Sequence, residues 1–529
     1  MFSFCLPSST RRVAALPLFA LALAFPESAQ DPAPQETTTQ GDGEEIRVFE
    51  LTLEDAMRIA LRNNLALQIE ALSTESAHYE ALGSWGAFDP VYSLTASYDT
   101  SESQATGSLS GGAVVRNDSL GYTTGLNIPF TTGGFLDLTL SHSNDETNNS
   151  FAAFDVSTTD VITVALTQPL LKGAWQRFAT TNQRLAELNF EIQRQRERQM
   201  RQRVLLDVSN TYWDLVSTIE ELGVRDIAVD LGQRQLDQDE KRLEVGVGTE
   251  VDVLQSETNV AQQDQLLLQA KFNLRTAEDN LRRILSRSAE DDTEELLDQW
   301  DWPIHPLTKL PQEVSVDVPD WRASLHLAEE HRPELAQRRL DIDAAEIGVT
   351  QARSDWLPSL DLSANMTGVG FDSDPAEAFD TASSFDFPRQ GVALTFRMPV
   401  FRRAARNRLR SSRAGLRSAR LSYDSTELDV LAEVRAAVRD ISYLGESVNA
   451  AVKSRSLAQR QLEAEKSRQR VGSSTTFQVL QFQEDLASAL SVEVAARAAF
   501  AKALVKLEYA EGQLDMKTAR EADPGDSKE

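Results

Sequence analysis

The chain contains the same turn motif twice, and this internal repeat constrains the fold more than any other feature. Residues 234–255 and 460–481 align without a gap at an offset of 226 residues. Both segments carry the pattern Val-Gly-x-x-Thr-x-x-x-Val-Leu-Gln, and each lies between two long polar stretches with helical periodicity. Such a repeat predicts two similar halves, each with a long helix, a turn and a returning helix.

Two further blocks align at larger offsets. Residues 67–98 match residues 335–366 at an offset of 268, and residues 162–171 match residues 392–401 at an offset of 230. The first half therefore has about 38 extra residues between its first and last strand-like segments, which at typical strand lengths is about two strands with their turns. We predict four strands in the first half and two in the second.

The composition indicates an exported, acidic protein. The formal net charge is −28, which argues against nucleic-acid binding because that requires a basic surface. Arg11 and Arg12 precede an apolar run at residues 13–25, which we interpret as part of a signal peptide; an N-terminal anchor is less favoured because the run falls short of ~20 residues. Cys5 precedes that run, so the exported chain is expected to contain no disulfide.

Six segments have the period-two pattern of strands, some with apolar residues alternating with small or polar ones. They are residues 91–99, 119–128, 135–142, 161–170, 359–367 and 391–400. A tight turn at residues 129–134 contrasts with long polar connections at residues 100–118, 143–158 and 368–390. Short turns on one side and long loops on the other are typical of an outer-membrane β-barrel, although the strand pattern alone also fits a soluble sandwich.

Six other segments are predicted to be helical. They are residues 53–88, 172–245, 251–286, 321–356, 403–471 and 477–512. The helix at residues 172–245 would be about 110 Å long and its two shorter partners about 54 Å each, so two short helices stacked end to end would match one long helix. The helices alone would equally suit an exported soluble coiled-coil scaffold. Strands with unpaired edges are not stable in lipid, however. If the six strands lie in a membrane, several chains must therefore combine their strands into one closed barrel.

Four motifs carry a family resemblance. They are LTLEDAMRIALRNNLAL at residues 51–67, LTQPLLKG at residues 166–173, HRPEL at residues 331–335 and the duplicated turn. In this order the chain resembles the TolC-type outer membrane efflux proteins over about residues 50–512. The resemblance implies a homotrimer with a β-barrel in outer-membrane lipid and a helical tunnel across the periplasm. It also implies a periplasmic adaptor protein and an inner-membrane RND, ABC or similar pump as partners, with no cofactor and no nucleic acid.

The expected fold is therefore a mixed α and β membrane protein, a trimeric β-barrel continued by a long α-helical barrel and internally duplicated. The predicted segments are a signal peptide (1–29), a flexible lead-in (30–50), a first repeat (51–286), an inter-repeat linker at the tunnel equator (287–320), a second repeat (321–512) and a disordered tail (513–529). The predicted function is the outer-membrane exit channel of a tripartite efflux or type I secretion system, and the alternative is the soluble scaffold.

The strand count departs from the best-known members of that family, which contribute four strands per protomer. Six strands predict an 18-strand trimeric barrel. The alternative is a 12-strand barrel with residues 119–143 as a hairpin outside it.

The duplicated turns are the candidate functional site. By resemblance they lie at the periplasmic tip, where an adaptor docks; the residues given this role are Val245, Gly246, Thr249, Val471, Gly472 and Thr475. The simpler reading is local: each glycine permits the chain to reverse and each threonine caps the returning helix. The family often narrows its tip with carboxylates just after the second turn, where this chain has Gln478 and Gln481. The first copy has Asp252 and Gln255 at the corresponding positions, and these four residues are the candidate tip aperture. Because glutamine carries no charge, we predict weak or no block by divalent cations.

A basic stripe follows the last strand-like segment. It consists of Arg403, Arg406, Arg410, Arg413, Arg417 and Arg420, spaced alternately three and four residues apart. Ala405, Leu409, Ser412, Leu416 and Ala419 form the packing seam beside it. The stripe could be a solvated face paired with acidic neighbours, a basic collar at the inner-leaflet headgroups, or a basic band inside the tunnel.

An enzyme is not expected. The five histidines show no metal-ligand spacing, and His326 and His331 are five residues apart rather than four. The sequence contains no nucleophile elbow, zinc motif or Gly-rich phosphate loop.

Overall fold

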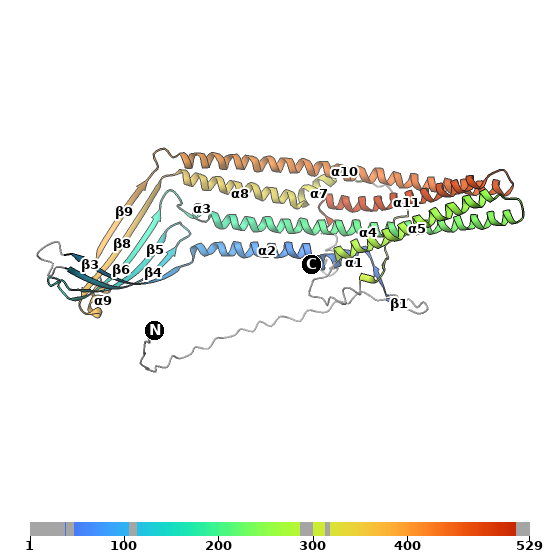
Figure 1. The fold of residues 1–529 in the computed structure, drawn as a ribbon. Coiled ribbons are helices and arrows are strands. Elements are labelled where there is room, and N and C mark those ends of the chain that lie inside the picture. Colours follow the sequence, from blue (N-terminus) through green and yellow to red (C-terminus); the bar gives the residue numbers. More distant parts are fainter. Residues whose placement is uncertain (1–36, 39–46, 105–113, 286–299, 313–317, 515–529) are drawn as a thin grey trace, which may run out of the picture.

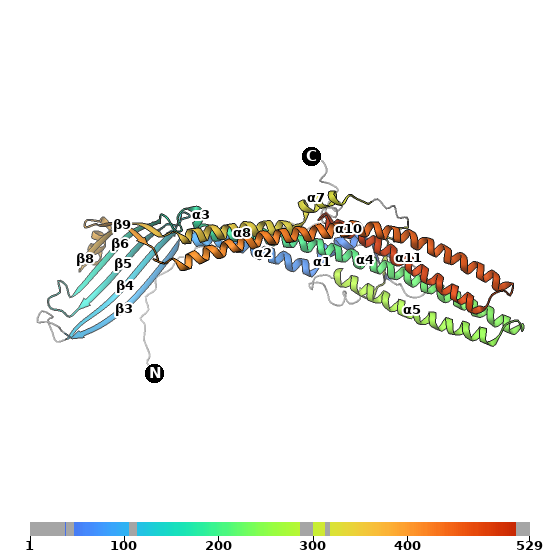
Figure 2. The same cartoon turned by 90° about the horizontal axis from the view of Figure 1, so that it is seen from above.

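The protein is elongated, with a β-sheet at one end and the turns of two helical hairpins at the other (Figure 1). A computed structural model describes residues 37–38, 47–104, 114–285, 300–312 and 318–514. The predicted signal peptide lies outside the described residues. Seen from above, the helices form a narrow layer that extends from the sheet to the turns (Figure 2).

The sheet has six antiparallel strands in the order β3-β4-β5-β6-β8-β9. The strands are β3 (Val91–Gln104), β4 (Val114–Pro129), β5 (Phe135–Thr147), β6 (Val156–Pro169), β8 (Ser359–Asp372) and β9 (Arg389–Arg397). Each overlaps one predicted strand segment, and most extend further into the predicted loops. The β4–β5 hairpin lies inside the sheet, between β3 and β6, and not beside it.

The connection between β8 and β9 contains a helix that the sequence reasoning missed. Residues 368–390 were predicted to be a loop, but α9 (Pro375–Ser384) forms within them. Asp374 caps this helix and Pro375 occupies its first turn, which is a recognisable start signal. Ala378 and Ala382 are fully buried against the sheet, and α9 packs on β8 and β6.

Four helical segments lie side by side between the sheet and the middle of the molecule (Figure 1). They are α2 (Leu65–Ser84), the first half of α4 (Thr181–Glu244), α8 (Pro333–Trp356) and the first half of α10 (Arg403–Arg470). In the other half, α4 and α10 continue beside α5 (Glu250–Leu285) and α11 (Thr476–Ala510). The long helices have 64 and 68 residues, about 100 Å each.

Three of the predicted helices are interrupted. The segment 53–88 divides at Asn64 into α1 (Leu53–Asn63) and α2, and ends in a 3-10 turn, η1 (Trp85–Phe88). The segment 321–356 divides into α7 (Trp321–His331) and α8, because the residue before a proline is pushed out of the helical region; Arg332 has φ −70° and ψ 119°.

The third interruption lies before α4. The predicted start at residue 172 is wrong, because Gly173 and Trp175 both have positive φ. Between Trp175 and α4, the chain forms only the short helix α3 (Gln176–Ala179).

The main core lies at mid-length, where several elements converge on α4. There β2 (Arg47–Leu51) pairs in parallel with β7 (Ile304–Pro306), and β1 (Thr37–Thr38) pairs with β2. The fully buried Tyr212 of α4 donates a hydrogen bond from its hydroxyl to the carbonyl of Leu51 (3.1 Å). The predicted flexible lead-in is therefore wrong for residues 47–50, and the predicted tail is wrong for Leu514, which is packed in the same core.

Candidate functional site

The two duplicated turns lie together at the end of the molecule opposite the sheet (Figure 1). The first joins α4 to α5 and the second joins α10 to α11. Gly246 and Gly472 have φ values of 75° and 77°, in the left-handed region that favours glycine. No atom lies within 4 Å of a Cβ built at either glycine, so the backbone angle and not a lack of space requires glycine there.

Both long helices end in the same hydrogen-bonded cap. In the first, the amide of Val247 donates to the carbonyl of Arg242 (2.9 Å) and that of Gly246 to Leu243 (3.0 Å). In the second, the amides of Ser473 and Gly472 make the equivalent bonds at 2.9 and 3.0 Å. This is the Schellman arrangement, which satisfies carbonyls left open at a helix end.

Both returning helices begin with the predicted threonine cap. The Thr249 hydroxyl donates to the Asp252 carboxylate (2.6 Å) and accepts from the Asp252 amide (3.2 Å). The Thr475 hydroxyl accepts from the Gln478 amide (3.4 Å), while the Gln478 side chain accepts from the Thr475 amide (3.4 Å). Two of the four predicted aperture residues are therefore occupied in capping. The Thr249 hydrogen bonds, above all, lower the pKa of Asp252, so it stays ionised.

The other two aperture residues are less constrained. Gln255 is half-buried and Gln481 is exposed, and within the described part of the chain neither side chain makes a hydrogen bond.

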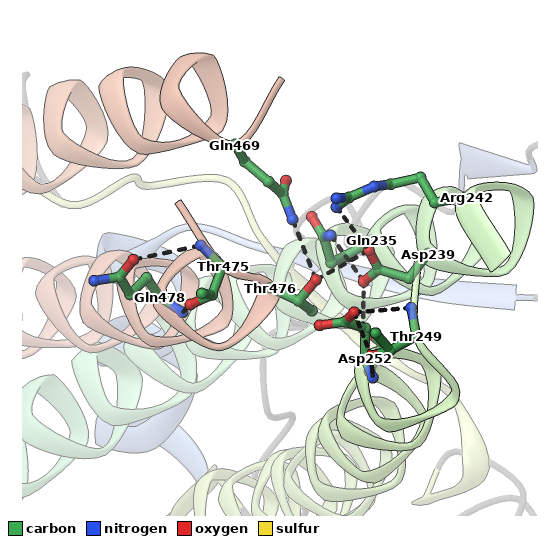
Figure 3. Close-up of polar contacts among 10 residues, drawn as sticks. Gln235, Asp239, Arg242, Thr249, Asp252, Gln469, Thr475, Thr476 and Gln478 are labelled. Carbon is green, nitrogen blue, oxygen red and sulfur yellow. Dashed lines mark hydrogen bonds and ion pairs between the residues drawn. The ribbon is translucent and has the colours of Figure 1, made fainter. Parts of the chain in front are cut away.

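A buried carboxylate joins the two hairpins, as Figure 3 shows. Asp239 of α4, only 1% exposed, accepts hydrogen bonds from Gln235 (2.9 Å) and from Ser256 of α5 (2.8 Å). Its other oxygen accepts from Thr476 of α11 (3.1 Å), and Arg242 lies 3.6 Å away. Asp239 therefore binds three helices together.

The second hairpin has a matching acidic residue. Glu465 is 5% exposed, accepts a hydrogen bond from Ser474 and pairs with Arg468 (3.2 Å). Neither acid is among the site residues predicted from the sequence. The signal was present, since the 226-residue offset aligns Asp239 with Glu465 and Arg242 with Arg468.

The sheet has one apolar and one polar face. Leu126, Leu138, Val164 and Met366 pair in register across four strands and therefore share a face. The neighbouring row on the opposite face contains Thr139, Thr163 and Thr367, with the last two hydroxyls 3.2 Å apart. An apolar face suits lipid and a polar face suits a water-filled lumen.

The basic stripe occupies an exposed face of α10. All six arginines are exposed, while the predicted packing seam beside them is half-buried against α8. Arg420 pairs with Glu346 (2.9 Å) and the Arg403 guanidinium lies 5.3 Å from the Phe401 ring centroid. The other four make no ion pair with any described residue.

Two features are absent from the described residues. Among them, no helix combines the length and hydrophobicity that a bilayer crossing requires. Within the same ranges, no three His, Cys, Asp or Glu side chains are grouped to hold a metal ion.

The architecture is therefore a two-faced sheet continued by helices about 100 Å long. Two solved outer-membrane channels have a similar fold. The OprN channel aligns with a TM-score of 0.65 at 17% identity, covering 87% of this chain and 90% of that one. The Campylobacter jejuni CmeC channel aligns at 0.64 and 16% identity, covering 89% and 88%.

The sequence comparisons identify the family. The family model for outer membrane efflux proteins matches residues 135–287 and 324–513, more than half of the chain, and the chain belongs to this family. It is 25% identical over 321 residues to outer membrane protein TolC of Salmonella enteritidis and 27% identical over 288 residues to TolC of Escherichia coli K12. These alignments cover 62% and 55% of the two relatives.

The family places this chain in the cell outer membrane, extending into the periplasm. The alternative of an exported soluble coiled-coil scaffold is wrong, because the chain belongs to a family of outer-membrane proteins.

Proposed function

We propose that three copies of this chain form the exit duct of a tripartite efflux or type I secretion system. The observation that carries this proposal is the open sheet. The edge strands β3 and β9 each pair on one side only, with β4 and β8, and their outer edges have no partner strand among the described residues; nearly all their residues are exposed. Unpaired backbone groups are too costly in lipid, so these edges must pair with other copies.

Exposed apolar stripes on the outermost helices support the same assembly. On α2 the stripe is Leu65, Ile69, Leu72, Tyr79 and Leu82, each at least 45% exposed. On α10, at the other edge of the helical layer, Leu421 and Leu428 are exposed by 60% and 64%. Residues three and four apart form one face of a helix, so α2 of one copy can pack on α10 of the next.

Three such sheets would supply 18 strands. The complete pairing of β4 with β3 and of β5 with β6 supports the 18-strand version over a 12-strand barrel with an external hairpin, because the latter requires β3 to pair with β6.

We assign adaptor docking to the tip, at Val245, Gly246, Thr249, Val471, Gly472 and Thr475. Val245 and Val471 are 71% and 79% exposed, which suits an apolar contact with a partner protein. The caps described above shape these turns without a partner, so docking adds to capping and does not replace it.

We also assign the aperture to Asp252, Gln255, Gln478 and Gln481. Because the ring of Gln478 and Gln481 is uncharged and the Asp252 carboxylate already accepts the Thr249 hydroxyl, single-channel currents should show weak or no block by divalent cations. Strong block that disappears in Gln478→Ala would contradict this assignment.

Cysteine cross-linking tests the shared sheet. The only native cysteine is Cys5, in the predicted signal peptide, so introduced pairs have a clean background. Leu94→Cys on β3 and Leu394→Cys on β9 should yield covalent trimers in membranes treated with a flexible bismaleimide. The matched control is Leu138→Cys on the central strand β5 with Leu394→Cys, which should yield none. Equal products from both pairs, or none from the edge pair, would overturn the trimeric barrel.

A further inference from the structure

The basic stripe is an isolated positive region on an acidic protein. The chain carries a net charge of −28, yet residues 402–420 contain eight arginines and no Asp or Glu. Of the six that form the stripe, only Arg420 has a carboxylate partner in the described part of the chain, at Glu346. Intramolecular pairing therefore leaves most of its charge unsatisfied.

The end of the stripe at Arg403 lies next to the sheet, because α10 begins six residues after the end of β9. Val392, Leu394 and Phe396 of β9 are all more than half exposed, and Val400 and Phe401, which follow β9 in the chain, are 82% and 78% exposed.

Aromatic rings mark this junction. The Arg402 guanidinium lies 4.1 Å from the Trp356 ring centroid, and Arg403 stacks over Phe401. Aromatic and arginine side chains in this order are typical of a membrane–water interface.

Distance along the helix divides the stripe. At 1.5 Å per residue, Arg403, Arg406 and Arg410 lie within about 11 Å of the start of α10, whereas Arg420 lies about 26 Å away. One headgroup layer is only about 5–8 Å thick, so long side chains reach it from the first two turns only. Farther from the sheet, the next two positions on the same face of α10 are acidic, Asp424 and Glu427.

We propose that Arg403, Arg406 and Arg410 bind the phosphate groups of anionic phospholipids in the inner leaflet of the outer membrane. The guanidinium group suits phosphate because it is permanently charged and donates several hydrogen bonds from one plane. The proposal rests on the outer-membrane location of the family and not on the proposed trimer. Its failure would leave the exit duct intact.

The test compares two triple variants of the full-length protein. Arg403→Gln, Arg406→Gln and Arg410→Gln form the upper set; Arg413→Gln, Arg417→Gln and Arg420→Gln form the control set. Both remove three charges from exposed positions of one helix face, so neither should alter the core. Each protein is reconstituted in vesicles of phosphatidylglycerol and phosphatidylethanolamine, extracted in mild detergent, and its retained lipids are counted by native mass spectrometry.

The upper set should lose phosphatidylglycerol preference by more than tenfold, since each arginine near an anionic surface contributes about fivefold. The control set should retain it within about twofold, and replacing the upper three by lysine should keep most of it, because charge is retained. Equal losses in the two Gln sets, or the same loss with lysine, would overturn the proposal. So would an altered ion selectivity with unchanged lipid retention, because that result would place the stripe in the lumen.

Discussion

Removing the Asp239 carboxylate should destabilise both helical hairpins at the end of the molecule opposite the sheet. In Asp239→Ala the buried side chains of Gln235, Ser256 and Thr476 lose their shared acceptor. Each buried donor left unpaired costs about 1–3 kcal/mol. The Arg242 pair adds little, because that side chain is 36% exposed and screened by solvent. We expect at least about 3 kcal/mol of local destabilisation.

Hydrogen exchange measures this loss where it occurs. A cost of about 3 kcal/mol corresponds to exchange about a hundredfold faster, at residues 235–256 and 469–480 together, because the carboxylate joins both hairpins. Asp239→Asn keeps one acceptor oxygen and should show a smaller effect. Glu240→Ala, an exposed charge on the same turn, is the matched control. Exchange in Asp239→Ala equal to that control, or faster exchange in one hairpin only, would refute the reasoning.

Three further predictions concern local geometry. Gly246→Ala and Gly472→Ala should each destabilise the tip by about 1–2 kcal/mol, seen as faster local exchange, because a positive φ is strained for alanine. Because the pKa of Asp252 is lowered in the folded protein, its cap contributes fully to stability above the carboxyl's unfolded pKa, and this contribution is lost as pH falls through the lower, folded pKa. The stability of the tip should therefore fall with acid in the parent protein, and this fall should be absent in Asp252→Asn. Gly370→Ala should release α9 and speed proteolysis of residues 373–388, because its Cβ would lie 1.7 Å from the carbonyl oxygen of Ala378; an unchanged digest would contradict that packing.

Much of the fold could be predicted because its signals are local and periodic. The six strand segments were found from their period-two pattern, and the two turns from a glycine and a threonine at fixed spacing. Helix boundaries were less accurate. Pro333 and Asn64 carry break signals that the long apolar periodicity outweighed, and α9 was hidden in a polar segment.

The candidate site was only half predictable. Its chain reversals and helix caps depend on residues within a few positions of Gly246 and Gly472. The repeated Val-Gly-x-x-Thr motif was therefore enough to predict them. The bond between Asp239 and Thr476 joins residues 237 positions apart, and no short motif records it.

The sequence by itself determined the repeated turns, the alternation that separates the two sheet faces, and the helix lengths of about 100 Å, because each depends on neighbouring residues and a fixed period. Only the tertiary structure decided that the β4–β5 hairpin lies within the sheet and that Asp239 is buried between hairpins. The physical reason is that strand order and the burial of a charge depend on which distant segments meet. A buried carboxylate is tolerated only where those segments supply its hydrogen-bond donors.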